Sequence, residues 1–260
     1  MFKTQGNIIF IDYSVMRNQI VILAAGQGTR MGNGETPKVL VMLKNKPLIL
    51  HLLEEVAKIN QLAKPLIVVG FRYKDVMAVL GEGYDYALQE RQLGTGHAVM
   101  SAKSKIYAEN ILVLYGDMPF IKAESIKKLL QLHQAKQSEL SMFTSLAPNF
   151  NAELASLNNY GRIIRDHNEN IVKITEYKDA SDKEKQVREV NPGIYVFNTT
   201  WLFQNIRELK NKNSQGEYYL TDMVELAIKD KKRVHSLPIE PKEVLGINTL
   251  EQLVIAENLI

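Results

Sequence analysis

The chain has 260 residues, of which 45% are hydrophobic and 23% are charged, and its formal net charge is +3. This composition is typical of a globular protein, and the small charge gives no indication of a nucleic-acid partner. The absence of cysteine excludes disulfides, thiolate catalysis and cysteine-based zinc sites, and it fits a cytoplasmic location. No apolar run approaches the roughly 20 residues that span a bilayer, so no membrane partner is expected.

The first half of the chain alternates short apolar runs with helical patterns. Residues 20–24 form a continuous apolar run that ends at Gly26, which is typical of a strand buried on both faces. After Pro47, apolar residues recur at helical spacing through residues 48–59. Further strands are expected at 66–69, 84–88 and 111–115, and further helices at 74–80, 98–103 and 124–134. This alternation predicts an α/β fold with a mostly parallel central sheet and helices on both faces.

The second half is less regular and richer in strands. Four strands are expected, at 140–146, 161–166, 171–177 and 191–198, of which the second and third would form a hairpin. Asp222 with Glu225, and Thr249 with Gln252, have the spacing of capping boxes and predict two helices. Asn248 would then lie at the end of an apolar strand, just before the last helix.

The strongest candidate binding element is the segment 23–31, LAAGQGTRM. A buried strand that runs into Gly26 and Gly28 leaves a turn whose backbone N–H groups can surround phosphate oxygens. Arg30 and Lys38 would add positive charge. The segment is neither a Walker A loop nor a Gly-x-Gly-x-x-Gly motif, because it lacks the Gly-Lys-Ser/Thr and the third glycine. The alternative is a simple turn with two solvated cations; the combination of residues favours phosphate binding.

A second candidate is Asp117, which directly follows the strand expected at 111–115. Ligands of open parallel sheets bind beyond the carboxyl ends of the strands, where this side chain would project. A carboxylate that faces phosphates is a suitable Mg²⁺ ligand. The alternative is an Asp-x-Pro turn whose carboxylate bonds its own backbone.

A third candidate is Gln89 together with the segment 92–97, QLGTGH. Side-chain amides both donate and accept hydrogen bonds, which suits the edge of a nucleotide base. Gly94 and Thr95 lie where a helix would begin, and a helix amino end can meet an anion. His97 is interpreted as structural, because no serine, cysteine or carboxylate motif accompanies it as a nucleophile system requires.

These segments together resemble the uridylyltransferase domains of bacterial N-acetylglucosamine-1-phosphate uridyltransferases. The resemblance runs from about Gln19 to the end of the chain. QLGTGH at 92–97 and QGEYY at 215–219 are particular to this family, whereas the first glycine-containing block is shared by many sugar nucleotidyltransferases. Further landmarks are the segments 37–40, 114–119, 160–162, 176–179, 191–193 and 246–248.

The resemblance implies a Rossmann-like nucleotidyltransferase fold and a cell-envelope precursor reaction. In it, UTP and N-acetylglucosamine 1-phosphate give UDP-N-acetylglucosamine and pyrophosphate. Carried over by position, Arg30 and Lys38 would act in catalysis on the triphosphate, and Asp117 and Asn248 would hold Mg²⁺. The nucleotide would contact Leu23, Ala24, Ala25, Gly26, Gly28, Thr29, Gln89, Gln92, Gly94 and Thr95. The sugar would contact Tyr115, Gly161, Glu176 and Asn191.

The implied organisation is an N-terminal extension followed by one nucleotidyltransferase domain. The extension covers residues 1–18, and the nucleotide-binding half covers 19–135. A smaller β-rich sugar-binding half covers 136–248, and a C-terminal helix covers 249–260. None of the hexapeptide repeats that carry acetyltransferase activity in many family members is present, so acetyl-CoA is not an expected partner.

Two positions depart from the family pattern. Pro192 stands where the family has threonine, beside an expected sugar contact, and the loop between Arg30 and Pro37 is slightly longer than usual. Pro192 leaves the sugar phosphate open, and the first glycine-containing block, which other sugar nucleotidyltransferases share, leaves another nucleoside triphosphate open. A non-catalytic nucleotide-sugar sensor on the same fold is the alternative of a different class.

Overall fold

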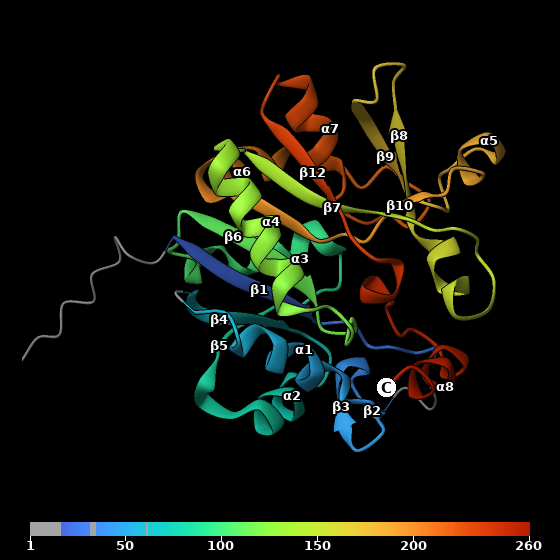
Figure 1. Ribbon diagram of the computed structural model, residues 1–260. Helices are drawn as coiled ribbons and strands as arrows, with labels where there is room; N and C mark the ends of the chain where they lie inside the picture. Colours follow the sequence, from blue (N-terminus) through green and yellow to red (C-terminus); the bar gives the residue numbers. More distant parts are fainter. Residues whose placement is uncertain (1–16, 32–34, 61) are drawn as a thin grey trace, which may run out of the picture.

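Ten strands in the described part of the chain form one mixed sheet (Figure 1). The computed structural model describes residues 17–31, 35–60 and 62–260. The strands are β1 (Asn18–Ala24), β4 (Leu62–Val69), β5 (Asp85–Leu88), β6 (Asn110–Tyr115), β7 (Leu140–Leu146), β8 (Gly161–Arg165), β9 (Ile171–Thr175), β10 (Glu189–Asn191), β11 (Tyr195–Asn198) and β12 (Val234–Pro238). A separate small hairpin joins β2 (Met42–Leu43) to β3 (Lys46–Pro47).

The sheet has a parallel part and a mixed part. β5, β4, β1 and β6 are parallel neighbours, as the alternation in the first half of the sequence predicts. β11 runs antiparallel to β6 and β7, and β10, β8 and β9 continue the antiparallel pairing, while β12 lies parallel to β7. The Gly116 N–H donates to the Leu23 carbonyl at 3.0 Å, so the loops that follow β1 and β6 leave the sheet side by side.

Alternating side chains of β1 supply two hydrophobic cores. Ile20 and Ile22 pack with α1, α2 and α4 on one face, and Val21 and Leu23 pack with α3, α6 and α7 on the other. The helices are α1 (Leu48–Ala57), α2 (Tyr73–Leu80), α3 (Thr95–Ala102), α4 (Ala123–Lys136), α5 (Asp182–Lys185), α6 (Thr199–Asn205), α7 (Asp222–Lys229) and α8 (Leu250–Glu257). Figure 1 shows the β8–β9 hairpin projecting at the end of the molecule opposite α1 and α2. No helix in the described residues is long and apolar enough to cross a membrane.

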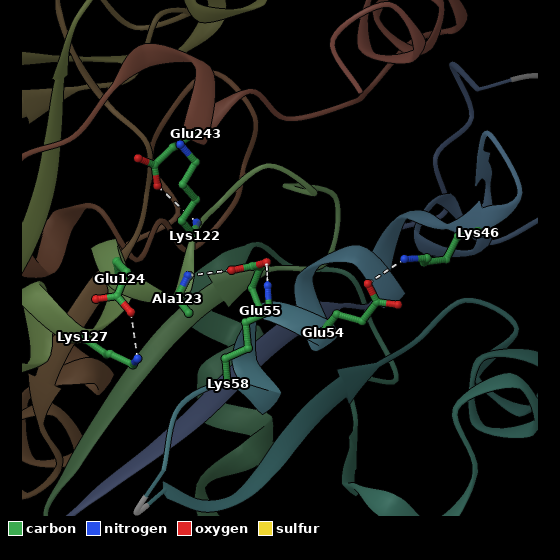
Figure 2. A network of polar contacts seen from close by, with 9 residues as sticks. All are labelled: Lys46, Glu54, Glu55, Lys58, Lys122, Ala123, Glu124, Lys127 and Glu243. Atoms are coloured by element: carbon green, nitrogen blue, oxygen red, sulfur yellow. Dashed lines mark hydrogen bonds and ion pairs between the residues drawn. The ribbon is translucent and has the colours of Figure 1, made fainter.

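Two carboxylates from other elements fix the amino end of α4 (Figure 2). Glu55 of α1 accepts a hydrogen bond from the Ala123 N–H at 2.9 Å. Glu243, in the 3-10 helix Pro241–Val244, accepts one from the Lys122 N–H at 3.1 Å. These bonds satisfy N–H groups that have no partner within the helix. They also hold the 3-10 helix, and the segment that follows it, close to the loop after β6.

The single strand expected at 191–198 is wrong, because the chain forms two strands there. β10 pairs with β7 and β8, whereas β11 pairs with β6 and β7. Pro192 has no N–H to donate to a ladder, and Gly193 has a φ of +78°, so the chain bends between the two strands. The sequence patterns also did not predict α6 or β12.

The helix boundaries differ in part from the capping boxes read in the sequence. Thr221, not Asp222, lies at the N-cap of α7, and no side-chain bond caps that helix. The Thr249 hydroxyl does accept from the Gln252 N–H at the start of α8, but the Gln252 side chain accepts from the Asn248 N–H. Residues 245–248 are irregular and do not form the expected strand.

Two expectations concern residues outside the described part. Of the extension expected at 1–18, residues 1–16 are not described, and Asn18 already belongs to β1. In the loop between Arg30 and Pro37, residues 32–34 are not described.

Candidate active site

Two adjoining cavities lie beyond the carboxyl ends of the parallel strands. The first cavity is lined by Leu23, Ala24, Ala25, Gly26, Gln89, Gln92, Gly94 and Ala98, among others. The second cavity is lined by Tyr160, Gly161, Glu176, Asn191, Gly193, Thr221, Gly246 and Asn248, among others. Lys38, Thr95, Tyr115, Asp117 and Glu217 line both. These five shared residues lie where the two cavities adjoin, so ligands in the two cavities would touch the same side chains.

The turn after β1 lies against Lys38. Gly28 has a φ of +70°, and a Cβ there would lie 2.5 Å from the Lys38 Cβ, so the close approach requires glycine. The Met31 N–H donates to the Gly28 carbonyl at 2.9 Å and closes the turn. Thr29 and Arg30 are exposed and are not among the residues that line either cavity. Of the two expected phosphate-binding cations, the fold therefore brings Lys38 into the site and leaves Arg30 outside the lining of both cavities.

Lys38 joins the two residues expected to hold a metal. Its ammonium forms an ion pair with the Asp117 carboxylate and donates to the Asn248 Oδ1 at 2.9 Å. Asp117 is only 8% exposed. The side chains of residues far apart in the sequence thus meet around one positive group.

The segment that carries Asn248 is tied to the loop after β6. The Ile247 N–H donates to the Asp117 carbonyl at 3.0 Å. The Gly246 N–H donates to the Tyr160 hydroxyl at 2.9 Å. These backbone bonds explain how an irregular segment can hold an amide side chain in a fixed place.

The oxygens around Lys38 fit a hard divalent cation. A carboxylate and an amide oxygen are typical magnesium ligands, and the Lys38 ammonium between them marks a place that favours positive charge. In the described residues no cluster of three or more His, Asp or Glu side chains could hold a metal. A metal bound to Asp117 and Asn248 would therefore take its other ligands from water and substrate phosphates.

The far end of the first cavity presents an amide. Gln89 follows β5 and is 3% exposed; its Nε2 donates to the Gly94 carbonyl at 3.1 Å and lies 3.1 Å from the His97 Nδ1. Gln92 donates to the Gln89 carbonyl at 3.3 Å. The Thr95 hydroxyl accepts a hydrogen bond from the Leu220 N–H, two residues before α7, at 3.0 Å. Gln89, Gln92, Gly94 and Thr95 thus all line the first cavity.

A short backbone pairing supports this end of the site. The Tyr218 N–H donates to the Leu93 carbonyl, and the Gly96 N–H donates to the Tyr218 carbonyl, both at 2.8 Å. A Cβ at Gly94, whose φ is +106°, would lie 2.7 Å from the Tyr218 carbonyl oxygen. The segment 215–219 is therefore a structural partner of the glycine loop.

Replacing Gly94 with alanine is expected to lower the free energy of unfolding by about 2–4 kcal/mol and to weaken nucleotide binding. The backbone conformation and the contact with Tyr218 both exclude a side chain at this position. Urea unfolding and calorimetric titration with UTP would measure the two effects. Gly83→Ala is the control, because a Cβ at Gly83 has no neighbour within 4 Å. Equal stability of the two variants would contradict the prediction.

The second cavity ends in buried polar groups. The Thr221 hydroxyl donates to the Glu176 Oε1 at 2.7 Å. Asn191, 5% exposed, donates through Nδ2 to the Tyr195 hydroxyl at 2.7 Å and accepts from the Gly193 N–H at 3.0 Å. The Asn191 amide keeps one N–H and one lone pair for a ligand. Its orientation is set by the same bend that divides β10 from β11.

Carboxylates near the second cavity have raised pKa values. Burial raises the pKa of Glu176, although the Thr221 hydrogen bond opposes that effect. Burial, with the nearby charge of Glu176, raises the pKa of Asp222 to about 6. Burial also raises the pKa of Tyr115 well above its usual value, so its hydroxyl stays protonated. This end of the site is therefore a place where added negative charge is costly.

Replacing Asp222 with asparagine is expected to stabilise the protein at neutral pH. The Asp222 pKa is higher in the folded than in the unfolded chain, so ionisation of this carboxyl disfavours folding as the pH rises from about 4 through about 6. The variant should gain about 1–2 kcal/mol at pH 7.5 and nothing at pH 4. Urea unfolding at both pH values would test this, with the exposed Asp230→Asn as control. A gain that is the same at both values would contradict it.

Several lining residues had no role in the sequence interpretation. Glu217 lines both cavities, and Tyr160, Thr221 and Tyr219 line the second cavity. Glu217 and Tyr219 lie in the QGEYY segment at 215–219, which was singled out only for its resemblance, and Thr221 follows that segment. Only the resemblance could have identified these lining residues, because the local sequence has no spacing that is typical of a catalytic motif.

Comparison with known proteins gives the family. Residues 20–215 match the family described as the MobA-like NTP transferase domain. The chain belongs to this family. Its mixed sheet with a parallel part is therefore that of a nucleotidyltransferase, which confirms the fold class expected from the sequence. Sugar nucleotidyltransferases generally use a divalent metal.

Similar proteins include several named "Bifunctional protein GlmU". The identity is 40% to the protein of Caldicellulosiruptor saccharolyticus, with 93% of this chain and 51% of that protein covered. It is 38% to that of Desulfotalea psychrophila, with 92% and 69% covered. It is 40% to that of Streptococcus mutans, with 94% and 52% covered. The chain thus spans about half the length of most of these relatives.

Solved structures confirm the fold at lower identity. The structure titled as apo UDP-glucose pyrophosphorylase has a TM-score of 0.76 at 19% identity, with 94% of this chain and 98% of that chain covered. The structure titled as a CMP:2-keto-3-deoxy-manno-octonic acid synthetase with CTP has a TM-score of 0.65 at 17% identity, with the same coverage.

Proposed function

We propose that the protein is a sugar-1-phosphate nucleotidyltransferase that joins UTP to N-acetylglucosamine 1-phosphate and releases pyrophosphate. The observation that carries this proposal is the shared lining of the two adjoining cavities, to which Lys38 and Asp117 both belong. A nucleotide in the first cavity and a sugar phosphate in the second would bring their phosphates together there. The similarity of 38–40% to the GlmU proteins supports the choice of uridine nucleotide and of N-acetylated sugar.

In this proposal the nucleotide lies along the turn after β1, with its base at Gln89 and Gln92. The segment 23–26 and the amino end of α3, with Gly94 and Thr95, line its path. The exposed Arg30 would reach the triphosphate from the solvent side. Binding in one orientation aligns the α-phosphorus for attack, which is the main way such an enzyme lowers the barrier.

The sugar would lie in the second cavity. Tyr115, Gly161, Glu176 and Asn191 surround it, and a Cβ at Gly161 would lie 3.3 Å from the Glu176 Oε1, so glycine keeps that carboxylate accessible. The remaining hydrogen-bonding capacity of Asn191 and Glu176 suits sugar hydroxyl and amide groups. A sugar that leaves one of these buried groups unpaired loses about 1–3 kcal/mol of binding free energy.

The chemistry is an in-line displacement at phosphorus. An oxygen of the sugar phosphate forms a bond to the α-phosphorus of UTP, and the bond between that phosphorus and the β-phosphate oxygen breaks as pyrophosphate leaves. Lys38 steadies the charge of the departing pyrophosphate. Asp117 and Asn248 would hold Mg²⁺, which neutralises phosphate charge and acts as a Lewis acid when bound.

Pyrophosphate release with Mg²⁺ tests the function directly. The panel pairs UTP, CTP, TTP, GTP and ATP with the 1-phosphates of N-acetylglucosamine, glucose and galactose. The expected result is fast release with UTP and N-acetylglucosamine 1-phosphate alone. Release only with another pair would overturn the substrate assignment. Folded protein that binds UTP by calorimetry but releases no pyrophosphate with any pair would overturn the enzymatic proposal.

A further inference from the structure

The amide nitrogen of Gln89 lies between two partners inside the protein. Its Nε2 donates to the Gly94 carbonyl at 3.1 Å, and the His97 Nδ1 lies at the same distance from that nitrogen. A primary amide has two N–H donors and one carbonyl acceptor. The Gly94 carbonyl can only accept, and a His97 ring without a proton on Nδ1 accepts the second hydrogen, which leaves the Oε1 atom of this amide for a ligand in the first cavity.

The reverse orientation of the amide is disfavoured. It would place the Gln89 Oε1 opposite the Gly94 carbonyl, with two acceptors and no hydrogen between them. It would also require a proton on the His97 Nδ1. Burial and the charge of Arg91 lower the pKa of His97, which favours the neutral ring. A neutral ring that accepts at Nδ1 carries its hydrogen on Nε2.

We infer that His97 is a positioning residue that fixes the Gln89 amide so that only an acceptor faces the base. This inference rests on the proposed function, because it assigns the means of base selection at the same site. Uracil and thymine carry an N–H between two carbonyl groups and can donate to the Gln89 Oε1. Cytosine presents an unprotonated ring nitrogen at that position and would face acceptor to acceptor.

In this inference His97 positions the Gln89 amide and does not act as part of a nucleophile system. It lies on α3, one turn before Ser101, whose hydroxyl donates to the His97 carbonyl at 2.9 Å. That bond, together with the helix backbone, holds the main chain of residue 97 independently of the ring. The ring nitrogen can therefore be altered while the helix is kept.

The experiment compares three variants with the wild-type protein. His97→Phe keeps a ring but removes the acceptor, His97→Asn restores an acceptor through its side-chain carbonyl, and Ser101→Ala perturbs the same helix without touching the ring. For each variant, kcat/KM is measured with UTP and with CTP at saturating N-acetylglucosamine 1-phosphate. Affinities for both nucleotides are measured by calorimetry, and thermal unfolding checks the fold.

The decisive readout is the ratio of kcat/KM for UTP to kcat/KM for CTP. We expect His97→Phe to lower it about tenfold, the size of one misdirected hydrogen bond, while His97→Asn and Ser101→Ala keep it near the wild-type value. An unchanged ratio in folded His97→Phe, or an equal fall in Ser101→Ala, would overturn the inference.

Failure of the proposed function would be seen separately. If wild-type protein binds UTP more tightly than CTP but turns over neither, the calorimetric ratio still tests His97 while the enzymatic proposal fails. If wild-type protein has no preference for UTP in binding or turnover, the positioning role fails even where pyrophosphate is released with another nucleotide.

Discussion

Replacing Asp117 with alanine is expected to lower kcat about 1,000-fold, because the substitution removes the only carboxylate that touches Lys38 in the described residues. The loss has two causes. A metal between the phosphates would keep only the Asn248 oxygen from the protein, and the Lys38 ammonium would lose the partner that positions it. The sugar cavity keeps Glu176 and Asn191, so KM for the sugar phosphate should change much less.

Pyrophosphate release at saturating substrates and Mg²⁺ would measure the Asp117 effect. Asp75→Ala is the matched control, because Asp75 is an exposed carboxylate on α2 that pairs with Arg72. The control should retain wild-type kcat. If the Asp117 variant turns over at a near-normal rate with Mg²⁺, the assignment of the metal site is wrong.

Replacing Lys38 with methionine is expected to have two opposite effects. Turnover should fall about 100-fold, because a cation that steadies the leaving pyrophosphate is lost. Affinity of the nucleotide-free protein for a divalent cation should rise about tenfold, because the ammonium that now neutralises Asp117 no longer competes with the metal. The same side chain is thus expected to help the reaction and to oppose metal binding in the free enzyme.

Titration of the nucleotide-free protein with Mn²⁺, followed by electron paramagnetic resonance, would measure the metal affinity. Lys46→Met is a suitable control, because Lys46 forms an exposed ion pair with Glu54 (Figure 2), and neither residue lines either cavity. Metal affinity that stays at the wild-type value in the Lys38 variant would show that the ammonium does not occupy the metal position. Unchanged turnover would remove Lys38 from the chemistry.

The parallel part of the fold could be predicted because its signals are local. A continuous apolar run that ends at glycine defines β1, and the same pattern ends β6 at Gly116. β12 gives no such signal, since four of its five residues are half-buried, the fifth is exposed, and buried and exposed residues do not alternate. The strand break at Pro192 was visible as a departure from the family pattern, but its structural meaning depends on which neighbours the flanking residues pair with.

The candidate site shows the same division. Asp117 and Gln89 follow strands that the sequence predicts, so the edge of the sheet where they lie could be inferred. The contact of Lys38 with Asn248 joins positions that no local pattern relates, and the pairing of Tyr218 with the glycine loop is of the same kind. Arg30 illustrates the converse, because a matching motif did not bring it into a cavity. Backbone path, not residue type, decides these cases.

The long separations around Lys38 also bear on how the protein is made. Lys38 lies 79 positions before Asp117 and 210 before Asn248, so the three can meet only once the chain has been made as far as residue 248. Loop closure over such distances comes late in folding. A growing chain on the ribosome can contain all the parallel strands β5, β4, β1 and β6 and still lack the cluster of Lys38, Asp117 and Asn248. Local opening of residues 245–248 would likewise remove Asn248 from Lys38 and Asp117 while the sheet stays folded.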